Sequence, residues 1–133
     1  MKRTLLIIAV LAFLTLTAAQ CSVSTANIAQ AFMSEDPDGN TVTTVYQADA
    51  VFYAIVDLAN APEETVVKAS WYAVQAADTE PNLFIDEASI TTSDGRLTFN
   101  LANQAGMLWP SGSYRVDLYL NDKLDRSLDF SVP

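Results

Sequence analysis

The chain has 133 residues, half of them hydrophobic, and a formal net charge of −9. This length and composition fit one folded domain with one core, and the acidic excess argues against binding nucleic acid or an anionic membrane surface through charge. The absence of histidine excludes Ser-His-Asp and Cys-His catalysis, and the single cysteine excludes an intrachain disulfide and a thiolate metal cluster.

The first 20 residues have the organisation of a bacterial secretory signal. Lys2 and Arg3 form a short basic start, an apolar run extends from Leu5 to Leu16, and small residues occupy positions 17–19. The apolar run is too short for a comfortable transmembrane helix. We therefore predict that residues 1–20 are a signal peptide and that the mature protein lies outside the cytoplasm.

Two processing routes are consistent with the end of this segment. Positions 17–19 resemble a type I signal peptidase site, with cleavage before Gln20. Positions 18–21 resemble a lipoprotein lipobox, in which Cys21 becomes the acylated N-terminus. In the first route Cys21 is a free thiol near the cut site, and in the second it anchors the protein to a membrane through its lipid. Residues 21–27 then form a short tether before a domain that spans residues 28–133.

The rest of the chain consists of short strand-like segments separated by turn residues. The last segments alternate apolar and polar side chains, which is typical of strands with one face in a core. No convincing helix and no internal repeat occur, so the pattern predicts an all-β sandwich of about seven to eight strands. The predicted strands are Ile28–Met33, Thr41–Tyr46, Ala50–Leu58, Thr65–Gln75, Leu83–Thr91, Arg96–Leu101, Tyr114–Leu120 and Leu124–Val132.

The first of these segments is expected at a sheet edge. The turn-rich stretch Ser34–Asn40 separates Ile28–Met33 from Thr41–Tyr46, so these two strands are candidates for a hairpin. Ala50–Leu58 is apolar on both alternating faces and is expected to be a central strand.

The clearest strand follows a corner. Pro110 fixes φ and Gly112 can adopt a positive φ, so the chain turns sharply before the alternating segment that begins at Tyr114. Asn121 and Asp122 tolerate the left-handed conformation that a tight hairpin needs, and they connect this strand to the last one. In the last strand the inward side chains are expected to be Leu124, Leu128, Phe130 and Val132.

Two aromatic residues resemble markers of a known class of sandwich. Trp71 lies in the middle of a strand, like the buried tryptophan of strand C in immunoglobulin-like domains. Tyr114 starts a strand after a Pro-x-Gly turn, which is similar to the tyrosine corner of strand F. The resemblance is to an immunoglobulin-like or fibronectin type III-like β-sandwich and covers roughly residues 28–133. It implies a fold and no particular activity.

Exposed aromatic residues are the first candidates for a binding face. If Trp71 points inward, Tyr72 points outward, and in an immunoglobulin-like arrangement Tyr119 shares its sheet face with Ser70 and Asp117. Aromatic platforms of this kind bind sugar rings or protein partners. The alternative is a cross-strand aromatic pair that only stabilises the sheet.

Two further positions have alternative interpretations. Trp109 either packs into the core or forms an exposed contact for a partner. Asp36, Asp38 and Asn40 offer oxygen ligands at alternate positions, as a calcium loop requires, but they lack the spacing of an EF-hand and also match a simple turn.

These features predict a non-catalytic module outside the cytoplasm, lipid-anchored or secreted, for protein interaction or structural spacing at the cell surface. One alternative is a carbohydrate-binding module that uses Tyr72, Tyr119 or Trp109. Another is a calcium-stabilised, adhesin-like unit. No cofactor is predicted, and the expected partner is a protein or glycan of the cell envelope, with membrane contact only through a lipid on Cys21.

Overall fold

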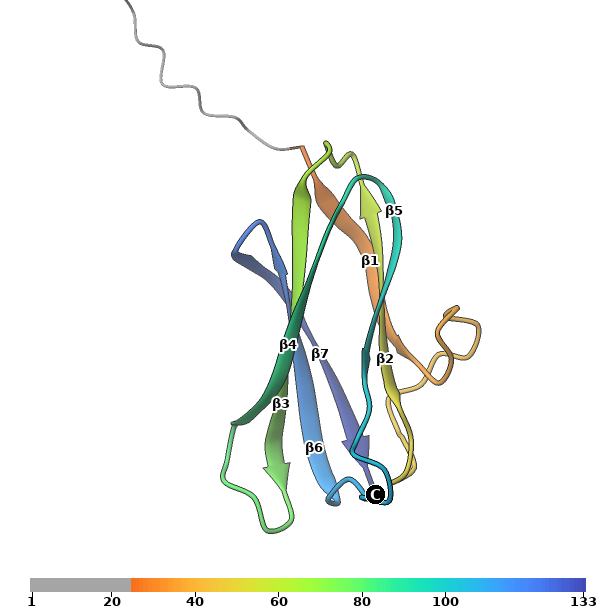
Figure 1. The fold of residues 1–133 in the computed structure, drawn as a ribbon, viewed down its shortest axis with the longest axis vertical. Helices are drawn as coiled ribbons and strands as arrows, with labels where there is room; N and C mark the ends of the chain where they lie inside the picture. Colours follow the sequence, from red (N-terminus) through yellow and green to blue (C-terminus); the bar gives the residue numbers. More distant parts are fainter. Residues whose placement is uncertain (1–24) are drawn as a thin grey trace, which may run out of the picture.

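The computed structural model describes residues 25–133, which form two packed β-sheets without a helix (Figure 1). The predicted all-β fold is confirmed, and seven of the eight predicted strands are present. They are β1 (Asn27–Ser34), β2 (Phe52–Ala59), β3 (Thr65–Ala76), β4 (Leu83–Thr92), β5 (Gly95–Leu101), β6 (Gly112–Leu120) and β7 (Lys123–Val132).

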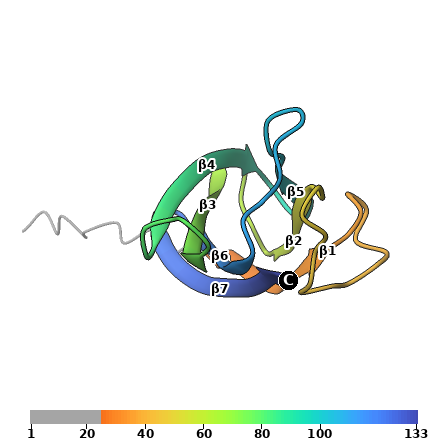
Figure 2. The ribbon, with the colours of Figure 1, turned by 90° about the horizontal axis from the view of Figure 1, so that it is seen from below.

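The strands divide into a three-stranded sheet, β1-β2-β5, and a four-stranded sheet, β4-β3-β6-β7. Every pairing is antiparallel. In the constant-type immunoglobulin arrangement the fourth strand belongs to the sheet of the first, second and fifth strands. Here β4 pairs with β3 instead, and then leads over the end of the sandwich into β5 (Figures 1 and 2). The predicted edge position of β1 and central position of β2 are confirmed.

The core lies between the two sheets and contains the two marker residues of the resemblance. Trp71 on β3 and Tyr114 on β6 are each 1% exposed. The Tyr114 hydroxyl donates a hydrogen bond to the carbonyl of Pro110, four residues upstream, as a tyrosine corner does. Burial raises the pKa of Tyr114, so its proton stays in place for this bond at neutral pH.

The predicted strand at Thr41–Tyr46 and its hairpin with the first strand are wrong. The segment makes isolated bridges only, between Val42 and Ser34 and between Val45 and Ser131 on β7, whereas β1 pairs with β2. The cause is Tyr46, whose ring is buried and whose hydroxyl donates to the carbonyl of Ser34 at 2.7 Å. Anchoring Tyr46 in the core draws the segment along the edge of β7.

The predicted inward position of Leu124 is also wrong, because this side chain is 52% exposed. The pairing of β6 with β7 shifts by one residue, so that Leu118 lies opposite Arg126 but Tyr119 lies opposite Leu124. A bulge of this kind reverses the faces of all residues on one side of it. Phe130 lies beyond the bulge and is buried as predicted.

The turn predictions at both ends of β6 are confirmed. Asn121 and Asp122 adopt φ values of 48° and 66°, and Gly112 adopts a φ of 153°. A Cβ atom at Gly112 would lie 2.2 Å from the carbonyl oxygen of Gln75 and 2.5 Å from the Cα atom of Ala76. β6 therefore approaches the end of β3 so closely that only glycine fits there.

This contact predicts the effect of two matched glycine substitutions. Gly106 also has a positive φ, of 80°, but a Cβ atom there has no neighbour within 4 Å. We expect Gly106→Ala to lower the free energy of unfolding by about 1 kcal/mol through backbone strain alone. Gly112→Ala is expected to lower it by about 3 kcal/mol or more, because steric overlap is added to the strain. Urea unfolding followed by tryptophan fluorescence measures both, and equal losses would contradict the close approach.

Candidate functional site

The outer face of the four-stranded sheet carries both predicted tyrosines. In the pairing of β3 with β6, Tyr72 lies opposite Arg115, and Lys68 lies opposite Tyr119. The Arg115 guanidinium lies 4.9 Å from the Tyr72 ring centre, and the Lys68 ammonium lies 4.5 Å from the Tyr119 ring centre. The shared face is therefore as predicted, but each tyrosine pairs with a cation and the two rings do not pair with each other.

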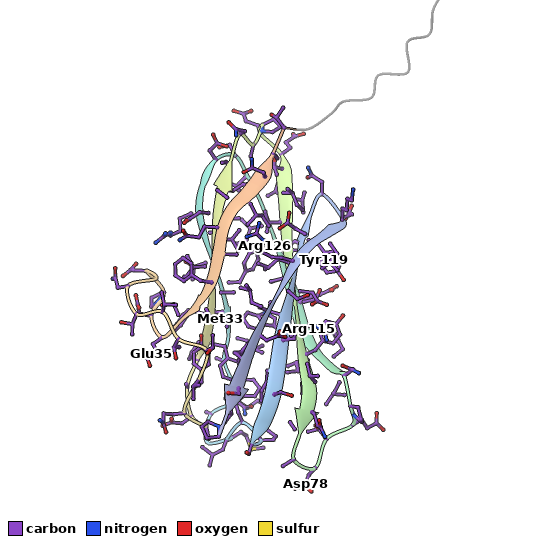
Figure 3. All side chains as sticks on the ribbon, turned by 180° about the vertical axis from the view of Figure 1, so that it is seen from behind. Met33, Glu35, Asp78, Arg115, Tyr119 and Arg126 are labelled. Atoms are coloured by element: carbon purple, nitrogen blue, oxygen red, sulfur yellow. The ribbon has the colours of Figure 1, made fainter. Side chains whose placement is uncertain are left out.

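The middle of this face is occupied by polar contacts between its own side chains. Asp117 is buried and accepts hydrogen bonds from the Arg115 guanidinium at 2.8 Å and from the Ser127 hydroxyl at 2.6 Å. The Ser70 hydroxyl donates to the Glu87 carboxylate at 3.2 Å. Figure 3 shows Arg115 and Tyr119 on this side of the molecule. A ligand on this face would have to compete with these internal partners.

The structure favours core packing for Trp109 over an exposed contact. It is 8% exposed and stacks on Phe52 with ring centres 4.7 Å apart. Its indole N–H donates to the carbonyl of Ala50 at 2.8 Å. Trp109 therefore packs into the core and fixes the connection between β5 and β6.

The predicted oxygen ligands of the turn have a structural role. The Asp36 carboxylate accepts hydrogen bonds from the backbone N–H groups of Asn40, Thr41 and Asp38, and from the hydroxyl of Ser34. These donors, with Asn40 first, hold the pKa of Asp36 below its usual value. No three His, Cys, Asp or Glu side chains gather as a metal site within residues 25–133. The carboxylate of Asp36 thus closes its own loop.

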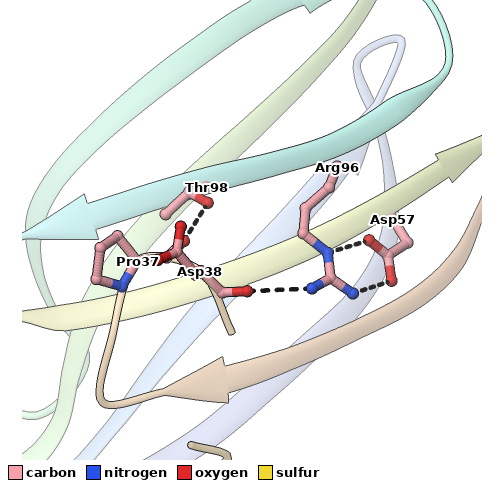
Figure 4. Close-up of polar contacts among 5 residues, drawn as sticks. All are labelled: Pro37, Asp38, Asp57, Arg96 and Thr98. Carbon is pink, nitrogen blue, oxygen red and sulfur yellow. Dashed lines mark hydrogen bonds and ion pairs between the residues drawn. The ribbon is translucent and has the colours of Figure 1, made fainter. Parts of the chain in front are cut away.

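This loop is attached to the outer face of the three-stranded sheet by two residues of β5 (Figure 4). The Thr98 hydroxyl donates to the carbonyl of Pro37 at 2.8 Å, and the Arg96 guanidinium donates to the carbonyl of Asp38 at 3.1 Å. Arg96 also makes a two-pronged contact with Asp57 on β2, at 2.6 and 2.8 Å. The hydrogen bonds from Arg96 lower the pKa of Asp57.

A hollow next to the Thr41–Tyr46 segment is bordered by Glu35, Asp49, Tyr46 and Tyr53, among others. Burial raises the pKa of Tyr46, whose hydroxyl already donates to the carbonyl of Ser34. Tyr46 therefore keeps its proton and acts as an anchor for the segment.

An apolar groove lies at one end of the sandwich. It encloses about 400 Å³ between the start of β4 and the connection from β5 to β6, and Trp109 and Tyr114 contribute to its lining. Seven large hydrophobic side chains are exposed within residues 25–133, and four of them line the groove. They are Leu83, Phe84, Met107 and Leu108. A concentration of this kind marks an interaction site more often than scattered exposed side chains do.

The sequence interpretation missed the groove. Leu83 and Phe84 were expected only as strand residues, and the segment that contains Met107 was expected only as a lead into the strand that follows Pro110. One signal was available: Leu97–Tyr114 contains no charged residue, which is unusual for a connection at a protein surface. What brings the two apolar segments together is the pairing of β3 with β4 and with β6.

The chain that forms the β4 wall of the groove contains acidic residues. No lysine or arginine occurs between Lys68 and Arg96. Within that interval the acidic residues are Asp78, Glu80, Asp86, Glu87 and Asp94. Figure 3 shows Asp78 at the end of the sandwich farthest from the point where the described chain begins. The groove is thus an apolar surface with acidic neighbours, at the end remote from Thr25.

No protein-family profile and no curated protein sequence matches this chain. Among solved structures, an immunoglobulin-like protein from Pseudomonas aeruginosa is similar over 81% of this chain and 96% of its own, with a TM-score of 0.56 and 16% identity. A mutant β-glucosidase from Listeria innocua, in complex with laminaribiose, matches 82% of this chain with a TM-score of 0.50 and 13% identity. An alkylpurine DNA glycosylase from Pseudomonas fluorescens, bound to DNA with an abasic site analogue, matches 80% with a TM-score of 0.50 and 14% identity.

This chain spans 16% of the β-glucosidase and 30% of the DNA glycosylase. At these identities the similarity concerns the fold alone. Together with the two antiparallel sheets, the buried Trp71 and the hydrogen-bonded Tyr114, it defines the class: the described chain is an immunoglobulin-like β-sandwich. Within residues 25–133 no helix is long and apolar enough to cross a membrane.

The contact between Asp57 and Arg96 predicts an acid-sensitive contribution to stability. The pKa of Asp57 is lowered from its ordinary value of 3.8 on folding, so the ionised carboxylate stabilises the folded state above that value, and the contribution is lost as the pH falls through the folded pKa. We expect Asp57→Asn to lower the free energy of unfolding by about 0.5–1 kcal/mol at pH 7, given that the pair is partly exposed.

The same variant is expected to lose less stability than the native protein between pH 5 and pH 3, as measured by urea unfolding at each pH. Asp78→Asn is the matched control, because Asp78 lies in an exposed loop and its φ of 58° is tolerated by asparagine. It should retain the native pH dependence. If Asp57→Asn also retained it, the two-pronged contact would not stabilise the fold.

Proposed function

We propose that this chain is a non-catalytic binding module that works outside the cytoplasm and recognises a protein partner through the apolar groove. The N-terminal sequence supports the location, because a basic start, a short apolar run and small residues precede Cys21. The module is then either lipid-anchored through Cys21 or released by cleavage before Gln20.

The observation that carries this proposal is the convergence of exposed apolar side chains on one groove. Leu108 is 65% exposed and Met107 is 58% exposed, although buried Trp109 lies directly beside them. Burying this exposed apolar surface against a partner would contribute roughly 25 cal/mol per Å² of favourable free energy. The groove lies at the opposite end of the sandwich from Thr25 (Figure 3), so a module anchored through its N-terminus would present the groove away from the membrane.

The chemistry of the groove supports binding rather than catalysis. Its lining contains no carboxylate and no lysine or arginine. Glycoside hydrolysis, for example, needs two carboxyl groups on either side of the scissile bond. Thr79 and Tyr114 supply the only hydroxyl groups of the lining, and Tyr114 uses its own for the bond to Pro110.

The two alternative functions have weaker support from the described residues. A sugar that stacks on Tyr72 or Tyr119 would compete with the cation that already lies over each ring. A calcium ion at Asp36 would compete with four hydrogen-bond donors for its carboxylate. Neither competitor exists at the groove, and the protein partner is therefore preferred.

The location predicts the mass of the mature chain. Intact mass spectrometry of the protein isolated from its native cells is expected to show a chain that begins at Cys21 with a diacyl or triacyl adduct, or a chain that begins at Gln20. Cys21→Ser should abolish the acylated form and leave the second route unaffected. A native protein that retains Met1 would contradict export by either route.

The groove predicts where a partner becomes crosslinked. A photoreactive amino acid placed at Leu108 in the full chain, expressed in the native cells, is expected to give a discrete adduct with one partner protein. Val42 is the matched control, because it is 66% exposed and lies outside the groove. We expect at least about tenfold less adduct from Val42, and loss of the Leu108 adduct when Phe84→Ser removes a groove wall. Equal adducts at both positions, or none at Leu108, would refute the proposed function.

A further inference from the structure

The strand beside the groove has an uncovered side. β4 is the outermost strand of its sheet and pairs only with β3. Four consecutive residues, Asp86–Ser89, are exposed although strand neighbours point to opposite faces. Both faces of β4 are therefore uncovered here, while its backbone stays paired with β3 as far as Thr92.

The outer edge of β7 is partly covered, unlike that of β4. The Thr44–Tyr46 segment lies along β7, where the N–H of Tyr46 donates to the carbonyl of Ser131 at 2.9 Å and the N–H of Ser131 donates to the carbonyl of Thr44 at 2.8 Å. The Arg126 guanidinium connects β7 to β1 by donating to the carbonyl of Ile28 at 2.6 Å. Proteins normally protect an edge strand with charged side chains, a proline, a bulge or a covering segment, and of these β4 has Asp86, Glu87 and the bulge beside Phe84. β4 has no lysine or proline in its ten residues.

The pairing of β4 with β3 is regular where the edge is most exposed. From Asp86 to Thr92 each residue is opposite a successive residue of β3, and the one irregularity lies between Asp86 and Phe84, at the groove. The free edge thus presents a continuous row of backbone positions that ends directly at an apolar groove. This combination suits an extended peptide, whose backbone pairs with the edge and one of whose side chains enters the groove.

The charge of this region selects the chemistry of such a peptide. Asp86 and Glu87 lie on β4 itself, and Asp78 and Glu80 lie in the connection before it, with no basic residue between Lys68 and Arg96. Across the sheet, Lys68 on β3 lies opposite Ser89 and over the Tyr119 ring, and Arg115 on β6 is paired with Asp117 and lies over Tyr72. A second copy of this chain would bring the same acidic residues together and be repelled, whereas a basic segment would be attracted.

We propose that β4 accepts an extended segment of a partner protein, rich in lysine or arginine, as an added strand, with one apolar side chain of that segment in the groove. The inference rests on the proposed function and specifies its partner and its geometry. The backbone of β4 supplies the affinity, the acidic residues supply the preference for basic sequences, and the groove sets the register.

The test uses a fluorescent peptide with the sequence Lys-Val-Lys-Leu-Lys-Val-Lys-Thr and the mature protein, at low salt. Fluorescence polarisation is expected to show saturable binding that weakens as salt is raised. A peptide with glutamate in place of every lysine should bind at least about tenfold more weakly. Two further peptides distinguish strand addition from charge attraction: one has N-methyl groups on its odd-numbered backbone amides and the other on its even-numbered ones. Because only one of these sets of amides faces β4, one of the two peptides should bind at least about tenfold more weakly than the parent.

Protein variants and hydrogen exchange locate the peptide. Asp86→Asn should weaken binding by about threefold or more through the loss of one charge. Asp122→Asn, at the turn between β6 and β7, is the matched control and should leave binding unchanged, since its φ of 66° suits asparagine. The bound peptide should slow amide hydrogen exchange in residues 86–92 and leave β7 unaffected.

The outcomes separate this inference from the proposed function. If the lysine peptide fails to bind, or if both N-methylated peptides bind as well as the parent, strand addition to β4 is wrong. In that case a Leu108 adduct with a partner would still support the groove as a protein-binding site. If the Leu108 adduct is also absent, both the inference and the proposed function fail.

Discussion

The aromatic cluster between the sheets is the contact on which the rest of the structure depends. Phe52, from the three-stranded sheet, contacts the rings of Tyr46, Trp109, Tyr114 and Phe130 at centre distances of 4.7 to 5.6 Å. Such pairs contribute about 0.5–1.5 kcal/mol each beyond the burial of their area. The chain has one cysteine and therefore lacks the inter-sheet disulfide of antibody domains, so this cluster packs the two sheets together without a covalent cross-link.

The same cluster positions the groove. Trp109 and Tyr114 belong both to the core and to the groove lining. Because the Trp109 ring is fixed by Phe52 and by the carbonyl of Ala50, the two residues before it cannot follow it inward, and Leu108 and Met107 remain outside. The exposed apolar side chains are therefore a consequence of a well-packed core and do not reflect a poorly packed loop. A site with a rigid floor of this kind loses little conformational freedom on binding.

The sequence predicted the features that depend on local alternation and failed where distant segments meet. Trp71 and Tyr114 were assigned to the core correctly, since a half-buried strand has a period of two. Leu124 was assigned wrongly because one bulge in the pairing of β6 with β7 reverses which side chains face the core, and no residue type in the strand predicts this bulge. Thr41–Tyr46 has strand composition, but burial of Tyr46 against Phe52 and Phe130 decides its path. The groove could be predicted only from the pairing of β3 with β4 and with β6.

The acidic charge opposes pairing between the uncovered β4 edges of two copies of the chain. Residues 25–133 contain 16 acidic and 5 basic residues, since Lys2 and Arg3 lie outside them. An exposed edge without lysine or proline invites pairing with another copy of the same chain, but each copy carries Asp86 and Glu87 at that edge and repels the next. Repulsion between like edges and attraction toward a basic segment have the same physical origin. In our proposal, the charge that opposes pairing between two β4 edges also selects the strand that β4 accepts.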